Sequence, residues 1–166
     1  MPFELVKSLT FESTRSTGAE KTFMTSKAFF DTNILVYSIE QNNLFKREIA
    51  KNLLKSHRDT GSGVISMQVL QELLSVCTRK LGVEPIGAKR ILKGFADLEI
   101  ISLTTELLDE AVDVMTQHSV SCWDGSIFAA ARAGRCTVIY SEDLQPGFAY
   151  QGVRVSNPFV DGSVLV

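Results

Sequence analysis

Short apolar runs alternate along this chain with longer stretches in which apolar residues recur at helical spacing. The apolar runs lie at residues 28–30, 64–67, 100–103, 137–141 and 153–155. Such alternation predicts βαβ crossovers and a mainly parallel sheet. No internal repeat and no linker between two cores interrupts the pattern. We therefore expect one α/β domain, a three-layer α/β/α sandwich with about five strands.

The helical stretches between these runs carry apolar stripes that predict the core faces of the helices. One stripe follows a break at residues 42–43, a second lies in a helix at about 68–80, and a third in a helix that begins at Pro85. The expected core residues are Phe45, Ile49, Leu53 and Leu54 in the first, Leu70, Leu73, Leu74 and Cys77 in the second, and Ile86, Ile91, Leu92 and Phe95 in the third.

The first 26 residues have a different composition from the rest. They are rich in Ser and Thr and lack periodicity, which predicts a flexible N-terminal leader before a folded domain at residues 27–160. Met24 stands just before the first strand. Two interpretations stay open: an ordinary flexible tail, or an upstream extension of a product that begins at Met24.

Composition narrows the class of protein. Hydrophobic residues make up 45% and charged residues 22% of the 166 residues, as in soluble globular proteins. No apolar run approaches the ~20 residues of a membrane helix, and charges interrupt the N-terminus where a signal peptide would be apolar. The three cysteines show no paired spacing and no cluster with histidine, which favours a reduced, cytoplasmic protein without a zinc site.

Four acidic residues stand at informative places. Asp31 ends the first strand, Glu72 lies on the helix after the second, Asp124 begins the helix before the fourth, and Asp143 follows the fourth. Strands one and four can be neighbours across a topological switch point, which would bring these carboxylates to one crevice. Crowded carboxylates repel one another, and a hard cation such as Mg²⁺ or Mn²⁺ offsets that repulsion. Such a site can hydrolyse a phosphodiester.

Each acid also has a purely structural explanation. Asp31, Asn33 or Asp124 can cap the helix that follows it, and Asp143 can belong to a turn. Glu72 can be an exposed helix residue. The net charge of −2 neither supports nor excludes a polyanionic substrate, because a metal site would account for several of the negative charges. The pattern alone therefore leaves both interpretations open.

Four segments together resemble the motifs of PIN-domain ribonucleases, with the closest likeness to the VapC toxins of bacterial toxin–antitoxin pairs. The segments are residues 30–37 (FDTNILVY), 68–73 (QVLQEL), 123–127 (WDGSI) and 139–144 (IYSEDL). The resemblance spans roughly residues 27–160. It implies a PIN-like fold, dependence on Mg²⁺ or Mn²⁺, and cleavage of RNA to a 5′-phosphate and a 3′-hydroxyl.

The resemblance also assigns roles to residues. It implies an acidic catalytic site formed by Asp31, Glu72, Asp124 and Asp143. In that site Asp31, Asp124 and Asp143 hold the metal, and Glu72 binds a second metal or orients the attacking water. Asn33 and Ser141 are then supporting polar residues.

Two positions depart from the family pattern. Gly125 stands where the family more often has Ala, which we expect to loosen that helix start. Glu142 precedes Asp143, so either acid could face the metal; we favour Asp143.

The family further implies a homodimer and a small antitoxin protein as partner. An RNA substrate needs basic residues at the rim of the site. The candidates are Arg79, Lys80, Lys89, Arg90, Lys93, Arg132 and Arg135. Two other functions remain open: a catalytically silent PIN-like module that binds RNA or protein, and a metal-dependent phosphatase.

Overall fold

The computed structural model describes residues 26–160. The predicted leader, including Met24, lies outside the described residues apart from Ser26. Within them a six-stranded sheet has the order β3-β2-β1-β4-β6-β5. The strands are β1 (Lys27–Phe30), β2 (Gly63–Ser66), β3 (Glu99–Ile101), β4 (Cys136–Tyr140), β5 (Ala149–Tyr150) and β6 (Val153–Ser156). All neighbouring pairs are parallel except β5 and β6.

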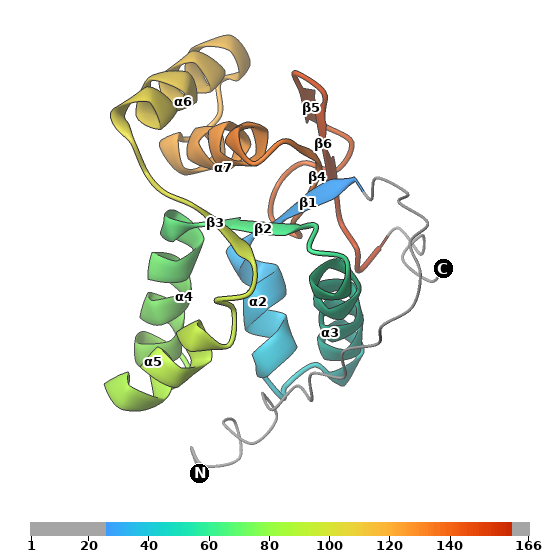
Figure 1. The fold of residues 1–166 in the computed structure, drawn as a ribbon, viewed down its shortest axis with the longest axis vertical. Helices are drawn as coiled ribbons and strands as arrows, with labels where there is room; N and C mark the ends of the chain where they lie inside the picture. The colour runs from blue at the N-terminus through green and yellow to red at the C-terminus, as the bar shows by residue number, and fades with distance from the viewer. Residues whose placement is uncertain (1–25, 161–166) are drawn as a thin grey trace.

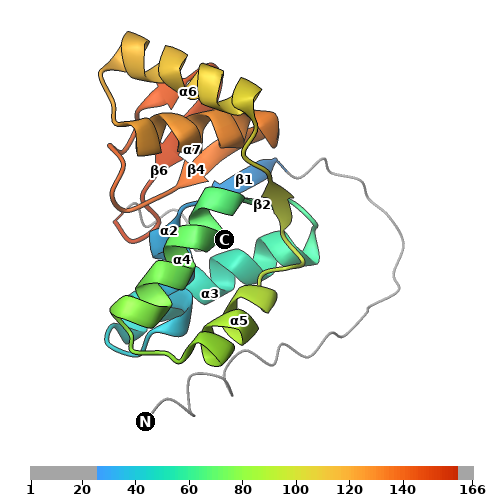
Figure 2. The ribbon, with the colours of Figure 1, turned by 90° about the vertical axis from the view of Figure 1, so that its left-hand side faces the viewer.

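Helices cover both faces of the sheet, as Figures 1 and 2 show. The helices are α2 (Thr32–Ile39), α3 (Leu44–Asp59), α4 (Met67–Arg79), α5 (Pro85–Lys93), α6 (Thr105–His118) and α7 (Cys122–Ala133). The pair α6 and α7 lies on one face, and α2 to α5 lie on the other. The predicted three-layer α/β/α sandwich is therefore confirmed. None of the helices in the described part of the chain is long and apolar enough to cross a membrane.

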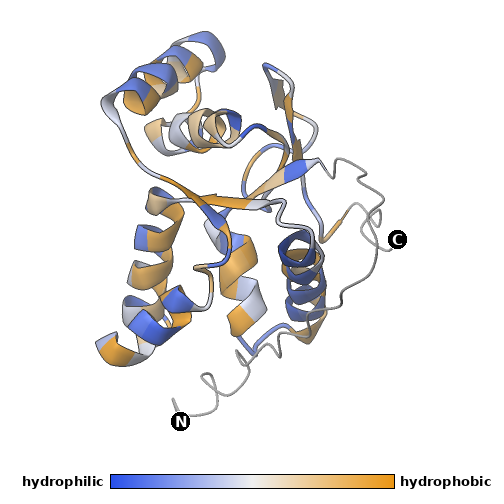
Figure 3. Cartoon of the chain, viewed as in Figure 1, coloured by the Kyte–Doolittle hydropathy of each residue, from blue (hydrophilic) through white to orange (hydrophobic). Residues whose placement is uncertain are grey.

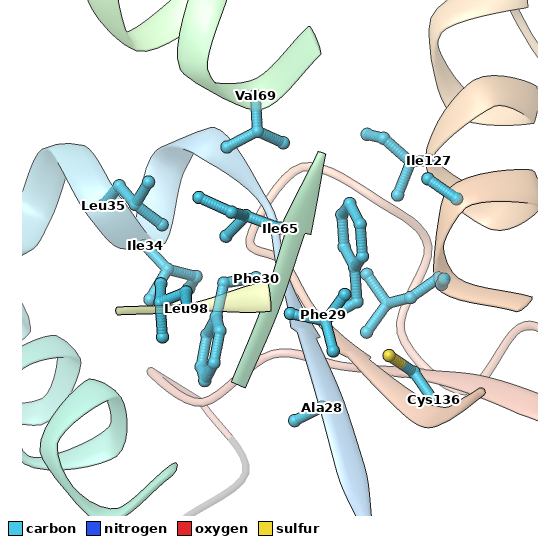
Figure 4. Close-up of a cluster of buried hydrophobic side chains, with 14 of the residues drawn as sticks. Ala28, Phe29, Phe30, Ile34, Leu35, Ile65, Val69, Leu98, Ile127 and Cys136 are labelled. Atoms are coloured by element: carbon cyan, nitrogen blue, oxygen red, sulfur yellow. The ribbon is translucent and has the colours of Figure 1, made fainter. Parts of the chain in front are cut away.

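The core follows from the apolar runs that form the strands. Phe29, Phe30, Ile65 and Ile139 are fully buried, because strands covered by helices on both faces have no solvent-facing side. Figure 4 shows these strands packed against side chains from the helices, including Ile127 of α7. In Figure 3 hydrophobic residues dominate the central strands, whereas polar residues cover much of α3.

Three details of the predicted core are wrong. Helix α4 buries Leu73 and Cys77 together with Val69, a face that leaves Leu74 exposed. Helix α5 faces the core through Ala88 and Ile91, so Ile86 in its first turn is 72% exposed. Phe45 is likewise exposed, because the buried residues of α3 begin only at Ala50.

The strand number was also underestimated. The sixth strand, β5, is only two residues long and pairs with β6 in an antiparallel hairpin. A segment of that length carries too few residues to show an alternating pattern.

Gly125 serves the packing of α7 against α6. A Cβ atom at this position would lie 2.6 Å from the backbone carbonyl oxygen of Ala111. The glycine thus permits a close approach of two helices, which the expectation of a loosened helix start did not include.

Replacing Gly125 with alanine is expected to lower the free energy of unfolding by about 1–3 kcal/mol, since overpacking against backbone cannot relax by a rotamer change. The measurement is urea unfolding followed by circular dichroism. Gly87→Ala in α5 is the matched control, because its added Cβ meets only a side-chain methyl group of Val83. Equal stability of the Gly125 variant and the unaltered chain would contradict the packing role.

Candidate active site

Asp31 lies where β1 passes directly into α2. Its backbone N–H donates to the carbonyl of Tyr140 at 3.0 Å, so the parallel pairing with β4 continues to this point. Its side chain also caps α2, because Oδ1 accepts from the backbone N–H of Thr32 at 2.7 Å. Capping and membership of the site are therefore compatible for this residue, and one carboxylate oxygen remains for other contacts.

Ser141 joins the ends of β1 and β4. Its hydroxyl donates to Asp31 Oδ2 at 2.7 Å and accepts from the backbone N–H groups of Asp143 and Leu144, both at 3.1 Å. The fully buried serine thus fixes the turn that carries Asp143. The neighbouring strands predicted from the sequence do bring Asp31 and Asp143 to the same edge of the sheet.

Asn33 links the two carboxylates directly. Its Nδ2 donates to Asp31 Oδ2 at 2.9 Å and to Asp143 Oδ2 at 3.2 Å. Its Oδ1 accepts from the backbone N–H of Glu142 at 3.3 Å. Both residues predicted to support the site, Asn33 and Ser141, therefore contact Asp31.

Glu72 approaches the site from α4. Its Oε2 accepts a hydrogen bond from the Thr32 hydroxyl at 2.7 Å, which orients an otherwise exposed side chain toward the start of α2. Thr32 was not among the predicted site residues, although it lies between two that were, Asp31 and Asn33. The signal was present in the run Asp31-Thr32-Asn33, whose middle residue carries a hydroxyl.

Asp124 lies in the first turn of α7. The helix is capped by Ser121, whose hydroxyl accepts from the Asp124 backbone N–H at 3.1 Å. The interpretation of Asp124 as the cap is therefore wrong. Within residues 26–160 its half-buried carboxylate accepts no hydrogen bond, which leaves both oxygens available to the pocket that it lines.

One pocket of about 950 Å³ collects all four predicted acids. Its walls come from α2, α4, the start of α7 and the turn after β4. Of the described residues that line it, five are acidic and only Lys80 is basic. The acidic residues are Asp31, Glu40, Glu72, Asp124 and Asp143.

The electrostatics of Asp31 reflect this crowding. Its pKa is raised from 3.8 to about 6, mainly by burial and against the lowering effect of hydrogen bonds from Ser141 and Thr32. The nearby charges of Glu72 and Asp143 contribute a smaller part of this rise. A buried carboxylate whose charge is costly at neutral pH is a common feature of functional sites.

Glu142 does not line this pocket. Its carboxylate forms an ion pair with Lys46 of α3 and accepts from the Tyr37 hydroxyl at 2.5 Å. Burial alone would raise its pKa, but these two hydrogen bonds hold the pKa below its ordinary value. Asp143, which lines the pocket, is thus the better candidate for the site. The sequence gives no signal for the Lys46 contact, which joins positions 96 residues apart.

The predicted basic rim is mostly absent from the pocket. Of the seven candidates only Lys80 lines it. Arg132 instead forms an ion pair with Glu110 at 2.7 Å. Charge alone therefore gives this pocket little attraction for a polyanion.

The donors of the pocket suit a hard dication, since they are carboxylate, amide and hydroxyl oxygens. Among residues 26–160, however, no three Asp, Glu, His or Cys side chains lie close enough together to hold a metal ion. Mg²⁺ usually takes only one or two carboxylates and keeps several waters. The pair Asp31 and Asp143, linked through Asn33, fits such a site, whereas shared ligation by Asp31, Asp124 and Asp143 stays a prediction.

Comparisons with known proteins add a family and a set of similar folds. The family model described as PIN domain matches residues 28–149. A comparison with curated proteins finds no match.

Three solved structures are similar in fold. A toxin–antitoxin complex from Klebsiella pneumoniae matches with a TM-score of 0.59 and 20% identity, covering 80% of this chain and 98% of that one. The Mycobacterium tuberculosis toxin VapC20, described as cleaving the sarcin–ricin loop, matches with a TM-score of 0.57 and 20% identity over 70% and 90%. A DNA-bound VapBC from Salmonella typhimurium gives 0.60 and 19% over 81% and 99%.

Proposed function

This chain belongs to the PIN-domain family, and we propose that it is a metal-dependent endoribonuclease, the toxin of a toxin–antitoxin pair. The observation that carries the proposal is the pocket lined by acids from separate segments of the chain, among them the buried Asp31. A fold held by ordinary packing gains nothing from gathering these charges, whereas hydrolysis of a phosphodiester needs them. The similar toxin structures support the same class of activity.

The residues of the pocket divide the work of hydrolysis. Asp31 and Asp143 would hold Mg²⁺ or Mn²⁺, and Asp124 would offer its carboxylate oxygens from the other wall. When bound, the ion supplies charge stabilisation at the phosphate and an acidified water. Ser141 and Asn33 keep the Asp31 carboxylate oriented by donating to its Oδ2.

Glu72 would accept the proton in this scheme. Thr32 occupies its Oε2, so its Oε1 can accept a proton from the attacking water. The oxygen of that water bonds to phosphorus as the P–O3′ bond breaks, and the leaving 3′ oxygen takes up a proton from solvent. The products are a 3′-hydroxyl and a 5′-phosphate. A second ion beside Glu72 is the alternative role that the family resemblance leaves open.

The proposed partners follow from the family. Two of the similar structures are toxin–antitoxin assemblies, which supports a small antitoxin protein as partner. We also propose a homodimer and a cytoplasmic location, where RNA is available and the thiols of Cys77, Cys122 and Cys136 stay reduced.

The test is an RNA cleavage assay on the full chain with Mg²⁺ or Mn²⁺, repeated with EDTA. Cleavage that needs the ion supports the proposal. RNA binding without cleavage would identify a silent binding module instead. Hydrolysis of a small phosphate ester without cleavage of RNA would identify a phosphatase.

The two neighbouring acids after β4 are expected to differ sharply. Glu142→Gln loses the ion pair with Lys46 outside the pocket and should change the cleavage rate by less than about tenfold. Asp143→Asn removes a charge from the pocket and should lower the rate by roughly 100-fold or more. Single-turnover cleavage rates compare the two variants. Equal losses would assign Glu142 to the site as well.

A further inference from the structure

Trp123 presents its indole ring to solvent at the edge of the acidic pocket. The side chain is 68% exposed, and it lines the pocket together with the neighbouring Asp124. Tryptophan is highly buried on average, so an exposed ring beside a site needs an explanation.

The backbone that carries this ring is fixed. Ser121 caps the first turn of α7 through the Asp124 N–H. The amide of the buried Gln68 donates to the Trp123 carbonyl at 3.5 Å and so ties α7 to the start of α4. The backbone from which the indole extends is therefore held at a defined place relative to Asp124.

The charge of the pocket decides what kind of contact would help an RNA to bind. Five acids and one lysine line the described walls, so phosphate contacts contribute little there. Stacking of a base on an aromatic ring does not depend on charge and tolerates any sequence. The volume of about 950 Å³ leaves room for a nucleotide, and the side chains of Gln68 and Gln71 add hydrogen-bonding groups to the same wall.

We propose that the Trp123 indole stacks on an unpaired nucleobase of the RNA, beside the phosphate that the acids act on. The inference rests on the proposed ribonuclease function and names the subsite that holds the strand in place. RNA recognition of this kind favours loops and single strands, whose bases can leave the helix stack.

A protein partner is the competing occupant of this surface. In residues 26–160, Trp123 is the only strongly exposed large hydrophobic side chain that also lines the pocket. The exposed Leu108 and Val112 lie on α6 and do not line it. A single strongly exposed ring lacks the contiguous exposed apolar patch that protein interfaces use, and it suits one base.

Trp123 is the sole tryptophan of the chain, so its fluorescence reports this site alone. The experiment titrates the full chain with a short single-stranded RNA, and with an abasic oligomer of equal length, with Ca²⁺ in place of Mg²⁺. We expect the RNA to quench the emission and the abasic oligomer to leave it unchanged. Binding of RNA without quenching, or no binding of RNA, would overturn the proposal.

Variants of Trp123 test how much the indole ring contributes to RNA affinity. Trp123→Ala is expected to weaken RNA binding about tenfold and to raise KM more than it lowers kcat, whereas Trp123→Phe retains most of the affinity. Val112→Ala, an exposed apolar truncation on α6, is the matched control and should bind RNA like the unaltered chain. An unchanged affinity in Trp123→Ala would overturn the proposal.

Two further results separate this inference from the proposed function. Cleavage of RNA with Mg²⁺ but without quenching would retain the nuclease and remove the stacking site. Base-dependent quenching without any cleavage would retain the site and remove the nuclease. An emission shift that depends on protein concentration in the absence of RNA would show a second copy covering Trp123, against the proposal.

Discussion

Asp31→Asn is expected to lower RNA cleavage by roughly 1,000-fold or more while the chain still folds, because an ion at this site is worth several kcal/mol of transition-state stabilisation. The asparagine keeps an oxygen to cap α2 through Thr32. It loses the negative charge. Its new amide N–H faces the side-chain amide of Asn33, whose Nδ2 donates to Asp31 Oδ2 in the unaltered chain. Cleavage rates with Mg²⁺, together with circular dichroism of the variant, measure the two expectations.

Glu40→Gln provides the matched control for this variant. Glu40 also lines the pocket, but it follows the C-terminus of α2, away from the contacts that join Asp31, Asn33 and Asp143. Removing its charge should change cleavage by less than about threefold, since solvent screens distant charges. Metal-dependent cleavage retained by Asp31→Asn would contradict the assignment of the site.

The parts of this site that the sequence predicted are those set by strand order. A polar residue at the end of a buried strand marks the carboxyl edge of a parallel sheet, and β1 and β4 do lie side by side there. Asp31, Ser141 and Asp143 therefore meet through backbone topology. The apolar runs carried enough information to place them.

The parts that the sequence did not predict depend on side-chain direction. The Thr32–Glu72 contact joins α2 to α4, and the Lys46–Glu142 contact joins α3 to the turn after β4. Both contacts depend on the rotation of a helix about its own axis. The same rotation left Leu74 exposed and buried Val69 instead. Helical spacing identifies the apolar face of a helix. If the centre of that face is misplaced by one residue, the charged side chains on the other faces are assigned to the wrong neighbours.

Stability is expected to fall as pH rises from about 4 to 6, and this loss should disappear in Asp31→Asn. The Asp31 carboxyl has a pKa of about 6 in the folded chain, against an ordinary value of 3.8 for an aspartate in water. Between these values the folded state binds the proton more tightly than the unfolded state, so deprotonation opposes folding. Relative to the unaltered chain, the variant should gain on the order of 3 kcal/mol in unfolding free energy across this interval.

Urea unfolding of the metal-free proteins across this pH range measures the gain. Glu142, whose pKa is lowered, contributes with the opposite sign, but it does so in both proteins and cancels in the difference. Adding Mg²⁺ should stabilise the unaltered chain above about pH 6. This stabilisation should be lost at lower pH, because protons compete with the ion for Asp31. The variant should respond little to the ion at any pH. Parallel pH profiles for the two proteins would mean that ionisation of the buried Asp31 carboxylate does not lower the free energy of unfolding. No cation would then be needed to offset its charge.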